Sequence, residues 1–222
     1  MANWIQEHVL KELIRHKTRR YSELRPRDIE GNLFMYHLKG LLREGIIEKT
    51  EKQYMLSKKG QQHVAQLSLS TGKQRRQPLV LNCIIAKNSE GEYLFLRWHR
   101  QPNTGLVSFP HGMMHYGEGS LSSAKRELAE KTGLGGDLSY IHTVPIRTLH
   151  NDAVERHMLV RLFRANNLQP LENTLPRTDT SEPFWASLNT IHPDDFIPGF
   201  HELAMAVDSD KLISITEIVV NN

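Results

Sequence analysis

HGMMHYGEGSLSSAKRELAEKTGL, residues 111–134, is the stretch that decides the fold of this chain. Its second half repeats apolar residues at three- and four-residue spacing, which predicts an α-helix over residues 120–131. Gly119 or Ser120 caps the predicted start, and Gly133 ends the helix because glycine readily adopts the left-handed conformation found there. The side chains that we expect to be buried are Leu121, Ala124 and Leu128.

Carboxylates gather at this predicted helix. Glu127 and Glu130 are three residues apart and therefore share one face, and Glu118 lies just before the helix. Mg²⁺ and Mn²⁺ prefer oxygen ligands, and a metal held there would stabilise charge on phosphoryl oxygens. The stretch therefore predicts a site for Mg²⁺ or Mn²⁺ with these three glutamates as ligands.

The spacing of this stretch resembles the Nudix box. Every defined position but one holds the residue type of that family, and the positions are Gly112, Glu118, Arg126, Glu127, Leu128, Glu130, Lys131, Gly133 and Leu134. The resemblance extends over residues 78–222, where FPHGMMHYGE looks like the family's loop and FWASLNTIHPDDFIPG like a Trp-containing segment of MutT-like members. It implies an α/β fold, an α/β/α sandwich with a mixed sheet, and Mg²⁺-dependent cleavage of a diphosphate bond, with Glu127 and Glu130 as the catalytic residues.

The same resemblance implies ligand contacts by Gly112, Arg126 and Arg97. Arg97 ends a predicted strand, at a position where family members often direct a basic residue toward nucleotide phosphates. The alternative for Arg97 is an ordinary solvated arginine at a strand end. Trp185 either borders the pocket or packs into the core.

Lys131 is the departure within the box, because it stands where the family carries the second glutamate of a pair. A protonated lysine cannot ligate a cation, and we expect it to pair with Glu127 one helical turn earlier. An exposed pair of this kind is worth only roughly a few tenths of a kcal/mol. Its importance is positional, since it would neutralise Glu127 and repel a dication. We therefore expect hydrolysis to be weakened or lost and ligand binding to survive.

His111 also departs from the family, since it replaces a loop glycine, and His115 follows it by four residues. Imidazole suits Zn²⁺ or Ni²⁺ better than Mg²⁺, so we expect hydrogen bonding by these histidines in preference to ligation. Around the box, PLVLNCIIAKNSEGEYLFLRWHR predicts a hairpin of two strands about the turn NSEGE. LSYIHTVPIRTL and ERHMLVRLFRA predict two further strands.

The N-terminal part has a different pattern. WIQEHVLKELIRH (residues 4–16) predicts a packed helix with Trp4, Ile5, Val9, Leu10, Leu13 and Ile14 on its apolar stripe. A short piece at 21–24, a helix ending at Gly45, a hairpin in IIEKTEKQYMLSKKG and a last helix, GQQHVAQL, follow. LFMYHLKGLLREGIIEK and YMLSKKG resemble the winged helix-turn-helix domains of archaeal and bacterial regulators, so we expect such a domain over residues 1–68, a polar linker at 69–77 and the Nudix-like domain at 78–222.

If that resemblance holds, the helix over residues 32–44 is the recognition helix for DNA. It implies major-groove contacts by Asn32, Tyr36, Lys39 and Arg43, and phosphate contacts by Arg25, Arg27, Lys49 and Lys52. The alternative is that the winged helix docks a protein or forms a dimer. Charge favours a polyanion, because residues 1–76 carry 16 Lys and Arg against 8 Asp and Glu, whereas the remainder carries 12 against 17.

Composition excludes other classes. The longest apolar runs are far shorter than a bilayer span, and the N-terminus is amphipathic with no signal sequence, so a cytoplasmic protein without membrane contact is expected. The single cysteine, Cys83, lies in an apolar strand and is expected to be a buried, inert thiol.

Two functions remain open at this stage. One is a transcription regulator whose winged helix binds DNA and whose Nudix domain binds a nucleotide or nucleotide-sugar diphosphate derivative without efficient turnover. The other is a Mg²⁺-dependent pyrophosphohydrolase of nucleoside diphosphate derivatives with an accessory winged helix. Lys131 and the uneven charge favour the first, and the retained box positions favour the second. A palindromic operator would imply a homodimer.

Overall fold

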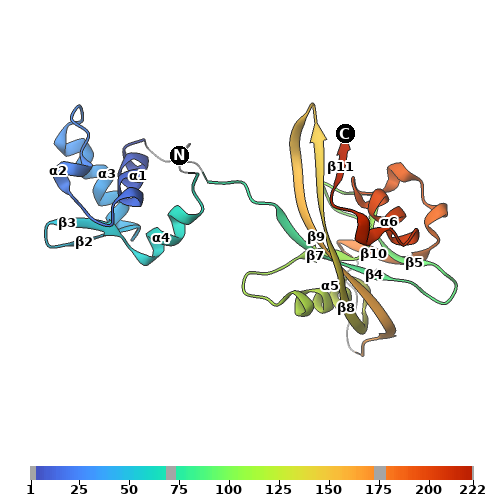
Figure 1. Cartoon of the computed structure of the whole chain (residues 1–222). Helices are drawn as coiled ribbons and strands as arrows, with labels where there is room; N and C mark the ends of the chain where they lie inside the picture. The colour runs from blue at the N-terminus through green and yellow to red at the C-terminus, as the bar shows by residue number, and fades with distance from the viewer. Residues whose placement is uncertain (1–3, 69–73, 173–178, 222) are drawn as a thin grey trace. The chain divides into compact units, whose positions relative to one another are not determined.

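The computed structural model describes residues 4–68, 74–172 and 179–221 of the chain. The chain divides into two compact units, residues 1–76 and 77–222 (Figure 1). Within the described ranges, each helix is too short or too polar to cross a bilayer.

The N-terminal unit is built from four helices and a small sheet. Its elements are α1 (Trp4–Arg15), β1 (Arg19–Arg20), α2 (Tyr21–Leu24), α3 (Gly31–Arg43), β2 (Ile47–Thr50), β3 (Gln53–Leu56) and α4 (Lys58–Ala65). The three strands are ordered β1-β3-β2 and are antiparallel. The core of this unit is formed by apolar side chains at helical spacing, chiefly Ile5, Val9, Leu10, Leu13, Phe34, Leu38 and Leu41.

The predicted stripe of the first helix is wrong at Trp4, whose side chain is 55% exposed. Side chains in a helix lean toward its N-terminus, so the ring of this first residue projects past the end of the packed surface. Helix α3 ends as its sequence predicts, because Gly45 follows it with φ 68°.

The C-terminal unit is built on two sheets. Its elements are β4 (Leu79–Ala86), β5 (Tyr93–Trp98), β6 (Val107–Ser108), β7 (His111–Met113), α5 (Ser120–Thr132), β8 (Leu134–His150), β9 (Ala153–Pro170), β10 (Ser181–Ala186), η1 (Leu188–Thr190), η2 (Pro193–Asp195), α6 (Phe200–Asp208), η3 (Leu212–Ser214) and β11 (Ile218–Asn221). One sheet has the order β11-β8-β9-β4-β7 and the other β10-β5-β6. The larger sheet is mixed, since β4 runs parallel to β9 and β8 runs antiparallel to it.

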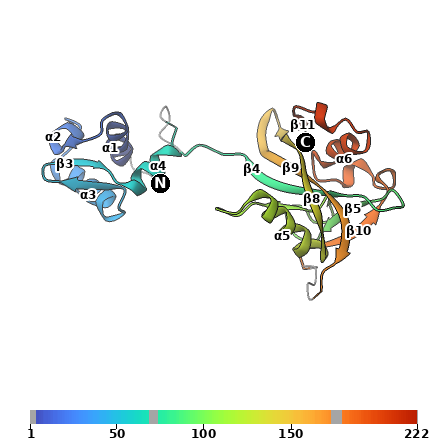
Figure 2. The ribbon, with the colours of Figure 1, turned by 60° about the horizontal axis from the view of Figure 1, so that its bottom comes forward.

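The two faces of β4 belong to different cores. Cys83 and Ile85 pack with α6, whereas Ile84 and Ala86 pack with α5. Because successive side chains of a strand point to opposite faces, one short apolar run serves both layers. Helices α5 and α6 thus lie on opposite sides of the sheets (Figure 2), which gives the α/β arrangement with a mixed sheet.

The two strands predicted within residues 78–100 are present, but their pairing as a hairpin is wrong. β4 and β5 lie in different sheets, and a single bridge between Lys87 and Tyr93 joins them. The reason is that β4 is buried on both faces and pairs along its whole length with β9, while β5 pairs with β10. Turn residues between two apolar runs show that the chain reverses there, but do not determine which strands become partners.

The predicted linker over residues 69–77 has an ordered end. The amide of Arg75 donates to the Gln66 carbonyl at 2.8 Å, and Leu67 bridges Gln74. Residues 74–76 therefore belong to the N-terminal unit, and residues 69–73 of the predicted linker lie outside the described residues.

Candidate functional site

Helix α5 is fixed to the sheet at its start and along its length. Gly119 is its N-cap residue, and the hydroxyl of Ser120 donates to Asn82 Oδ1 at 3.0 Å. Gly133 ends the helix with φ 70°. Ala124 and Leu128 are fully buried against the sheet, as the sequence predicts, but Leu121 is 45% exposed, and Ser123 lies in the buried surface in its place.

Glu127 lies directly against Gly112 on β7. A Cβ at Gly112 would overlap the carboxylate of Glu127 in its present position, so a larger residue there would force this acid to move. The Glu127 side chain is buried, at 5% exposure of the residue. The structure therefore gives a steric reason for the glycine that the box requires at this position.

Arg126 binds the three box carboxylates. Its Nε and Nη2 donate to the two oxygens of Glu118, each at 2.9 Å, in a bidentate pair. Its Nη1 donates to Glu127 Oε1 at 2.7 Å and lies 3.6 Å from Glu130 Oε2. The hydrogen bonds from Arg126 and from the His115 amide lower the pKa of Glu118 to about 2, and those carboxylates raise the pKa of Arg126.

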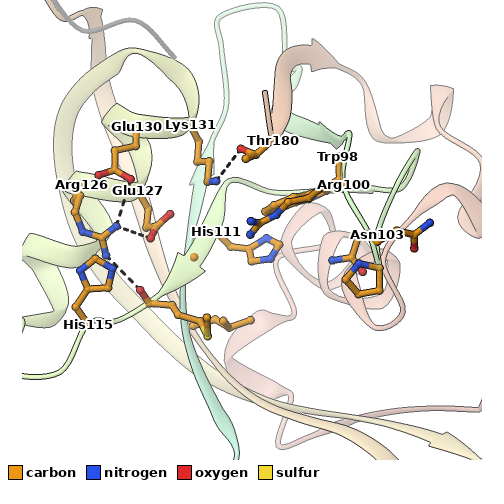
Figure 3. Close-up of a pocket in the computed structure, with 15 residues that line it drawn as sticks. Trp98, Arg100, Asn103, His111, His115, Arg126, Glu127, Glu130, Lys131 and Thr180 are labelled. Atoms are coloured by element: carbon orange, nitrogen blue, oxygen red, sulfur yellow. Dashed lines mark hydrogen bonds and ion pairs between the residues drawn. The ribbon is translucent and has the colours of Figure 1, made fainter. Parts of the chain in front are cut away.

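A cavity of about 400 Å³ opens beside this cluster (Figure 3). Helix α5 supplies one wall, the segment that follows β5 supplies a second, and β7 with the loop after it supplies a third. The residues that line the cavity are Leu81, Trp98, Arg100, Gln101, Pro102, Asn103, His111, Gly112, Met113, His115, Arg126, Glu127, Glu130, Lys131 and Thr180.

Lys131 lies in this cavity and is only 8% exposed. Its Nζ donates to Thr180 Oγ1 at 3.3 Å and lies 5.2 Å from the centroid of the Trp98 ring. We predicted an ion pair between Lys131 and Glu127, and the structure corrects this. Glu127 pairs with Arg126, and the lysine extends toward Thr180 (Figure 3). A cation over an aromatic face is favourable, and the packed Trp98 ring draws the side chain that way.

His111 forms hydrogen bonds, as predicted. Its Nδ1 lies 3.0 Å from the Phe109 carbonyl, which can only accept, so this nitrogen carries the proton. The ring lies between Trp98 and Phe200, with centroids 5.1 and 4.8 Å away. Burial lowers the pKa of His111 to about 4, and the ring is therefore neutral at pH 7. His115 is exposed at the rim of the cavity.

The side chains present do not fit a tightly held divalent ion. Among the described residues, no three acidic, histidine or cysteine side chains form a group that could hold a metal. Glu118 is held by Arg126, and one oxygen of Glu127 is bound by the same guanidinium. Lys131 adds a second positive charge to the helix wall. Mg²⁺ or Mn²⁺ would have to displace or approach these cations, which costs electrostatic energy.

The structure brings some of the predicted site residues together at the cavity, and leaves others outside it. Gly112, Arg126, Glu127 and Glu130 line the cavity, whereas Glu118 does not line it and is bonded to two residues that do, Arg126 and His115. Arg97 does not line it, because its guanidinium donates to the Gly105 carbonyl at 3.0 Å and lies over Phe184. Trp185 is half-buried against the core beneath α5.

The cavity wall also contains polar and aromatic residues that the sequence did not indicate, among them Trp98, Arg100, Asn103 and Thr180. Trp98, Arg100 and Asn103 come from the end of β5 and the segment after it, and Thr180 precedes β10. The available signal was the alternation of β5, which points Arg97 and Trp98 to opposite faces, together with the basic and aromatic composition of RWHRQPN. Nothing in the sequence around Thr180 indicates its position.

On the N-terminal unit, the residues predicted to contact DNA are all exposed: Arg25, Arg27, Asn32, Tyr36, Lys39, Arg43, Lys49 and Lys52. Four of them share one face of α3, opposite its buried Phe34 and Leu38. Lys49 lies on β2, and Lys52 lies in the turn between β2 and β3.

The NUDIX domain model matches residues 77–205. The chain is similar to the solved NUDIX hydrolase from Nitrosomonas europaea, with a TM-score of 0.52, 15% identity, and coverage of 61% of this chain and 91% of that one. It is also similar to a MutT NUDIX hydrolase from Burkholderia pseudomallei (TM-score 0.46, 19% identity, 62% and 99% covered). A third structure is the NUDIX domain of Shewanella oneidensis NrtR complexed with ADP ribose (TM-score 0.46, 15% identity, 69% and 97% covered).

At 15% identity, the likeness to the Nitrosomonas europaea structure shows a common fold and nothing about substrate. Comparison with curated proteins gives no match. The family model covers more than half of the chain. The chain therefore belongs to the NUDIX domain family.

Proposed function

We propose that this protein is a transcription regulator whose NUDIX domain binds a nucleotide diphosphate derivative with little or no hydrolysis, and whose N-terminal unit binds DNA as a winged helix. The observation that carries the proposal is Lys131. Its ammonium lies buried in the cavity, on the helix that carries Glu127 and Glu130. A cation at that position disfavours a second cation and favours an anionic ligand.

The cavity has the features of a ligand site. It combines fixed charges with an aromatic ring, Trp98, and its volume is within the range of small-molecule pockets. ADP-ribose is a suitable first compound, since it contains a diphosphate between two ribose groups.

The N-terminal unit has the order of elements of a winged helix: helix, strand, helix, helix and a two-stranded hairpin. If the unit is a winged helix, α3 is its recognition helix, and the hairpin of β2 and β3 is its wing. Among the described residues, no ion pair is seen at Arg25, Arg27, Lys39 or Arg43, so their charges are available to phosphates. The excess of basic residues over residues 1–76 agrees with this interpretation.

The DNA part is tested with a random-sequence duplex at several salt concentrations. Replacing Arg25 and Arg27 with alanine should reduce the slope of log K against log salt by about 2, because two phosphate contacts are lost. The matched control is Lys17→Ala with Lys58→Ala, which removes the same charge from exposed positions elsewhere on the unit. Equal slopes of log K against log salt for the two double variants would show that Arg25 and Arg27 do not contact DNA phosphates.

The regulatory part requires that the ligand changes DNA affinity. The DNA titration is repeated with saturating ADP-ribose, once the operator has been selected from a random library. A shift of the dissociation constant supports sensing. A ligand that binds the NUDIX domain and leaves DNA affinity unchanged refutes sensing and leaves both binding activities intact.

We propose a Mg²⁺-dependent pyrophosphohydrolase of nucleoside diphosphate derivatives as the second candidate, because Glu127 and Glu130 both line the cavity. The test compares the native protein with Lys131→Glu and Glu127→Gln on ADP-ribose and other diphosphates with Mg²⁺ or Mn²⁺. Strong native turnover that Glu127→Gln abolishes would favour the hydrolase over the regulator. No native turnover, with a gain in Lys131→Glu, would favour the regulator.

A further inference from the structure

The charges around the cavity are divided between two sides (Figure 3). On one side Arg126 is surrounded by Glu127 and Glu130 and is bound to Glu118, so its charge is compensated locally. On the other side Lys131 and Arg100 both contact the ring of Trp98, with Nζ and Cζ 5.2 and 6.0 Å from its centroid. The wall of the cavity at Trp98 therefore carries two cations.

Lys131 is built into this wall. The residue is only 8% exposed, and its ammonium is positioned by a hydroxyl, that of Thr180, and by the Trp98 ring. An ammonium has three donors, and ammonium and guanidinium groups both bind phosphate oxygens well in partly buried sites.

We propose that this cavity binds the diphosphate group of a nucleoside diphosphate or its ester directly through Lys131 and Arg100, without a divalent metal ion. This inference rests on the proposed function and specifies how its ligand is held. Lys131 supplies at a fixed place the positive charge that a metal ion would otherwise bring to the phosphates. The Trp98 ring holds both cations on one wall, and the carboxylates around Arg126 keep the anion on that side of the cavity.

The metal dependence of binding follows from this arrangement. A diphosphate in solution chelates Mg²⁺, and the complex carries less negative charge than the free diphosphate, so a cationic wall attracts it less. Binding should therefore be as tight, or tighter, in EDTA than with excess Mg²⁺. A site that uses the metal as a bridge would show the opposite order.

The experiment measures the binding of ADP and of inorganic pyrophosphate to the full-length protein by isothermal titration calorimetry, in EDTA and in excess Mg²⁺. The variants are Lys131→Gln and Arg100→Gln, which remove the charge and keep a polar side chain. Lys125→Gln is the matched control, since Lys125 lies exposed on the same helix and does not line the cavity.

We expect binding of both probes in EDTA. Loss of one charged hydrogen bond should weaken it by about 10- to 100-fold in Lys131→Gln and in Arg100→Gln, with Lys125→Gln unchanged. Circular dichroism checks that each variant is folded. Should a variant fail to fold, the comparison of EDTA with Mg²⁺ in the native protein still decides the question.

The outcomes separate this inference from the proposed function. Native binding that requires Mg²⁺ overturns metal-free recognition and leaves the regulator proposal standing. Binding in EDTA that a folded Lys131→Gln variant retains in full also overturns the inference. Absence of binding in both buffers overturns it together with the ligand part of the proposed function.

Discussion

Acidification from pH 7 to pH 5 should destabilise the C-terminal unit through His111. The imidazole is buried between Trp98 and Phe200, and burial, together with the charges of Lys131 and Arg156, lowers its pKa to about 4. In the unfolded chain the same group has its ordinary pKa of 6.5. The unfolded state therefore binds a proton at a higher pH than the folded state does. This contribution to stability is complete above pH 6.5 and is lost as the pH falls toward 4.

The magnitude follows from the size of that difference. One pKa unit corresponds to about 1.4 kcal/mol, so the full difference for His111 is worth about 3 kcal/mol. Between pH 7 and pH 5 the free energy of unfolding should fall by about 2 kcal/mol from this group alone. The measurements stop at pH 5 so that Glu118 does not contribute to the change. Its pKa is about 2, against an ordinary value of 4.5, and its contribution to stability is therefore lost only at lower pH.

The assay is urea denaturation at pH 7, 6 and 5, followed by tryptophan fluorescence. A Trp4→Phe background removes the exposed tryptophan of the N-terminal unit, so Trp98 and Trp185 report the C-terminal unit alone. His111→Gln removes the titrating group and keeps a donor for the Phe109 carbonyl. His150→Gln is the control, since His150 is exposed in the same unit.

We expect the native protein and His150→Gln to lose about 2 kcal/mol more of their free energy of unfolding than His111→Gln does between pH 7 and pH 5. The difference in stability between the native protein and His111→Gln should therefore shrink as the pH falls. Parallel stability curves for the native protein and His111→Gln would refute a buried neutral imidazole at this position.

Three further predictions concern the site and its support. Gly112→Ala should cost about 1–3 kcal/mol in urea denaturation, because its methyl group overlaps the Glu127 carboxylate; an unchanged midpoint would contradict the close approach. Arg126→Gln should raise the pKa of Glu118 from about 2 toward its ordinary value, measured by carbon-detected NMR titration; a Glu118 pKa that stays near 2 would show that another group holds this carboxylate. Leu128→Ala should destabilise the C-terminal unit by about 2–5 kcal/mol, since Leu128 is fully buried beneath α5; a smaller loss in the same fluorescence assay would mean that the helix is held mainly at its ends.

The sequence predicts most accurately what short-range signals determine. Helix α5 was expected over residues 120–131 and extends over Ser120–Thr132, because its cap, its apolar spacing and its terminal glycine all lie within the helix or next to it. The hairpin of β4 and β5 was wrong because strand partners are determined by packing far along the chain. Periodicity alone carries no information about that choice.

The site was predicted where its residues fall in one motif, and missed where they come from other segments. Gly112, Glu127 and Glu130 belong to the box and line the cavity. Arg100 and Thr180 line it from two distant segments; the basic and aromatic composition of RWHRQPN is the one signal for Arg100, and nothing in the sequence marks Thr180. The orientation of Lys131 toward Trp98 could not be predicted either, because helix geometry offered Glu127 as the nearer partner.

The parallel pairing of β4 with β9 has a consequence for how the protein folds during synthesis. Residues 79–86 form their ladder with residues 158–165, so the apolar run LVLNCIIA cannot find this partner until the ribosome has made twice as much chain. The N-terminal unit has no such delay, since its hairpin joins β2 and β3 across a two-residue turn. Contacts between residues far apart in the sequence are slow to form, because the entropy of loop closure is lost before the contacts can offset it. The N-terminal unit should therefore be complete while β4 is still an unpaired strand, and this interval is the one in which the nascent chain is most exposed to aggregation.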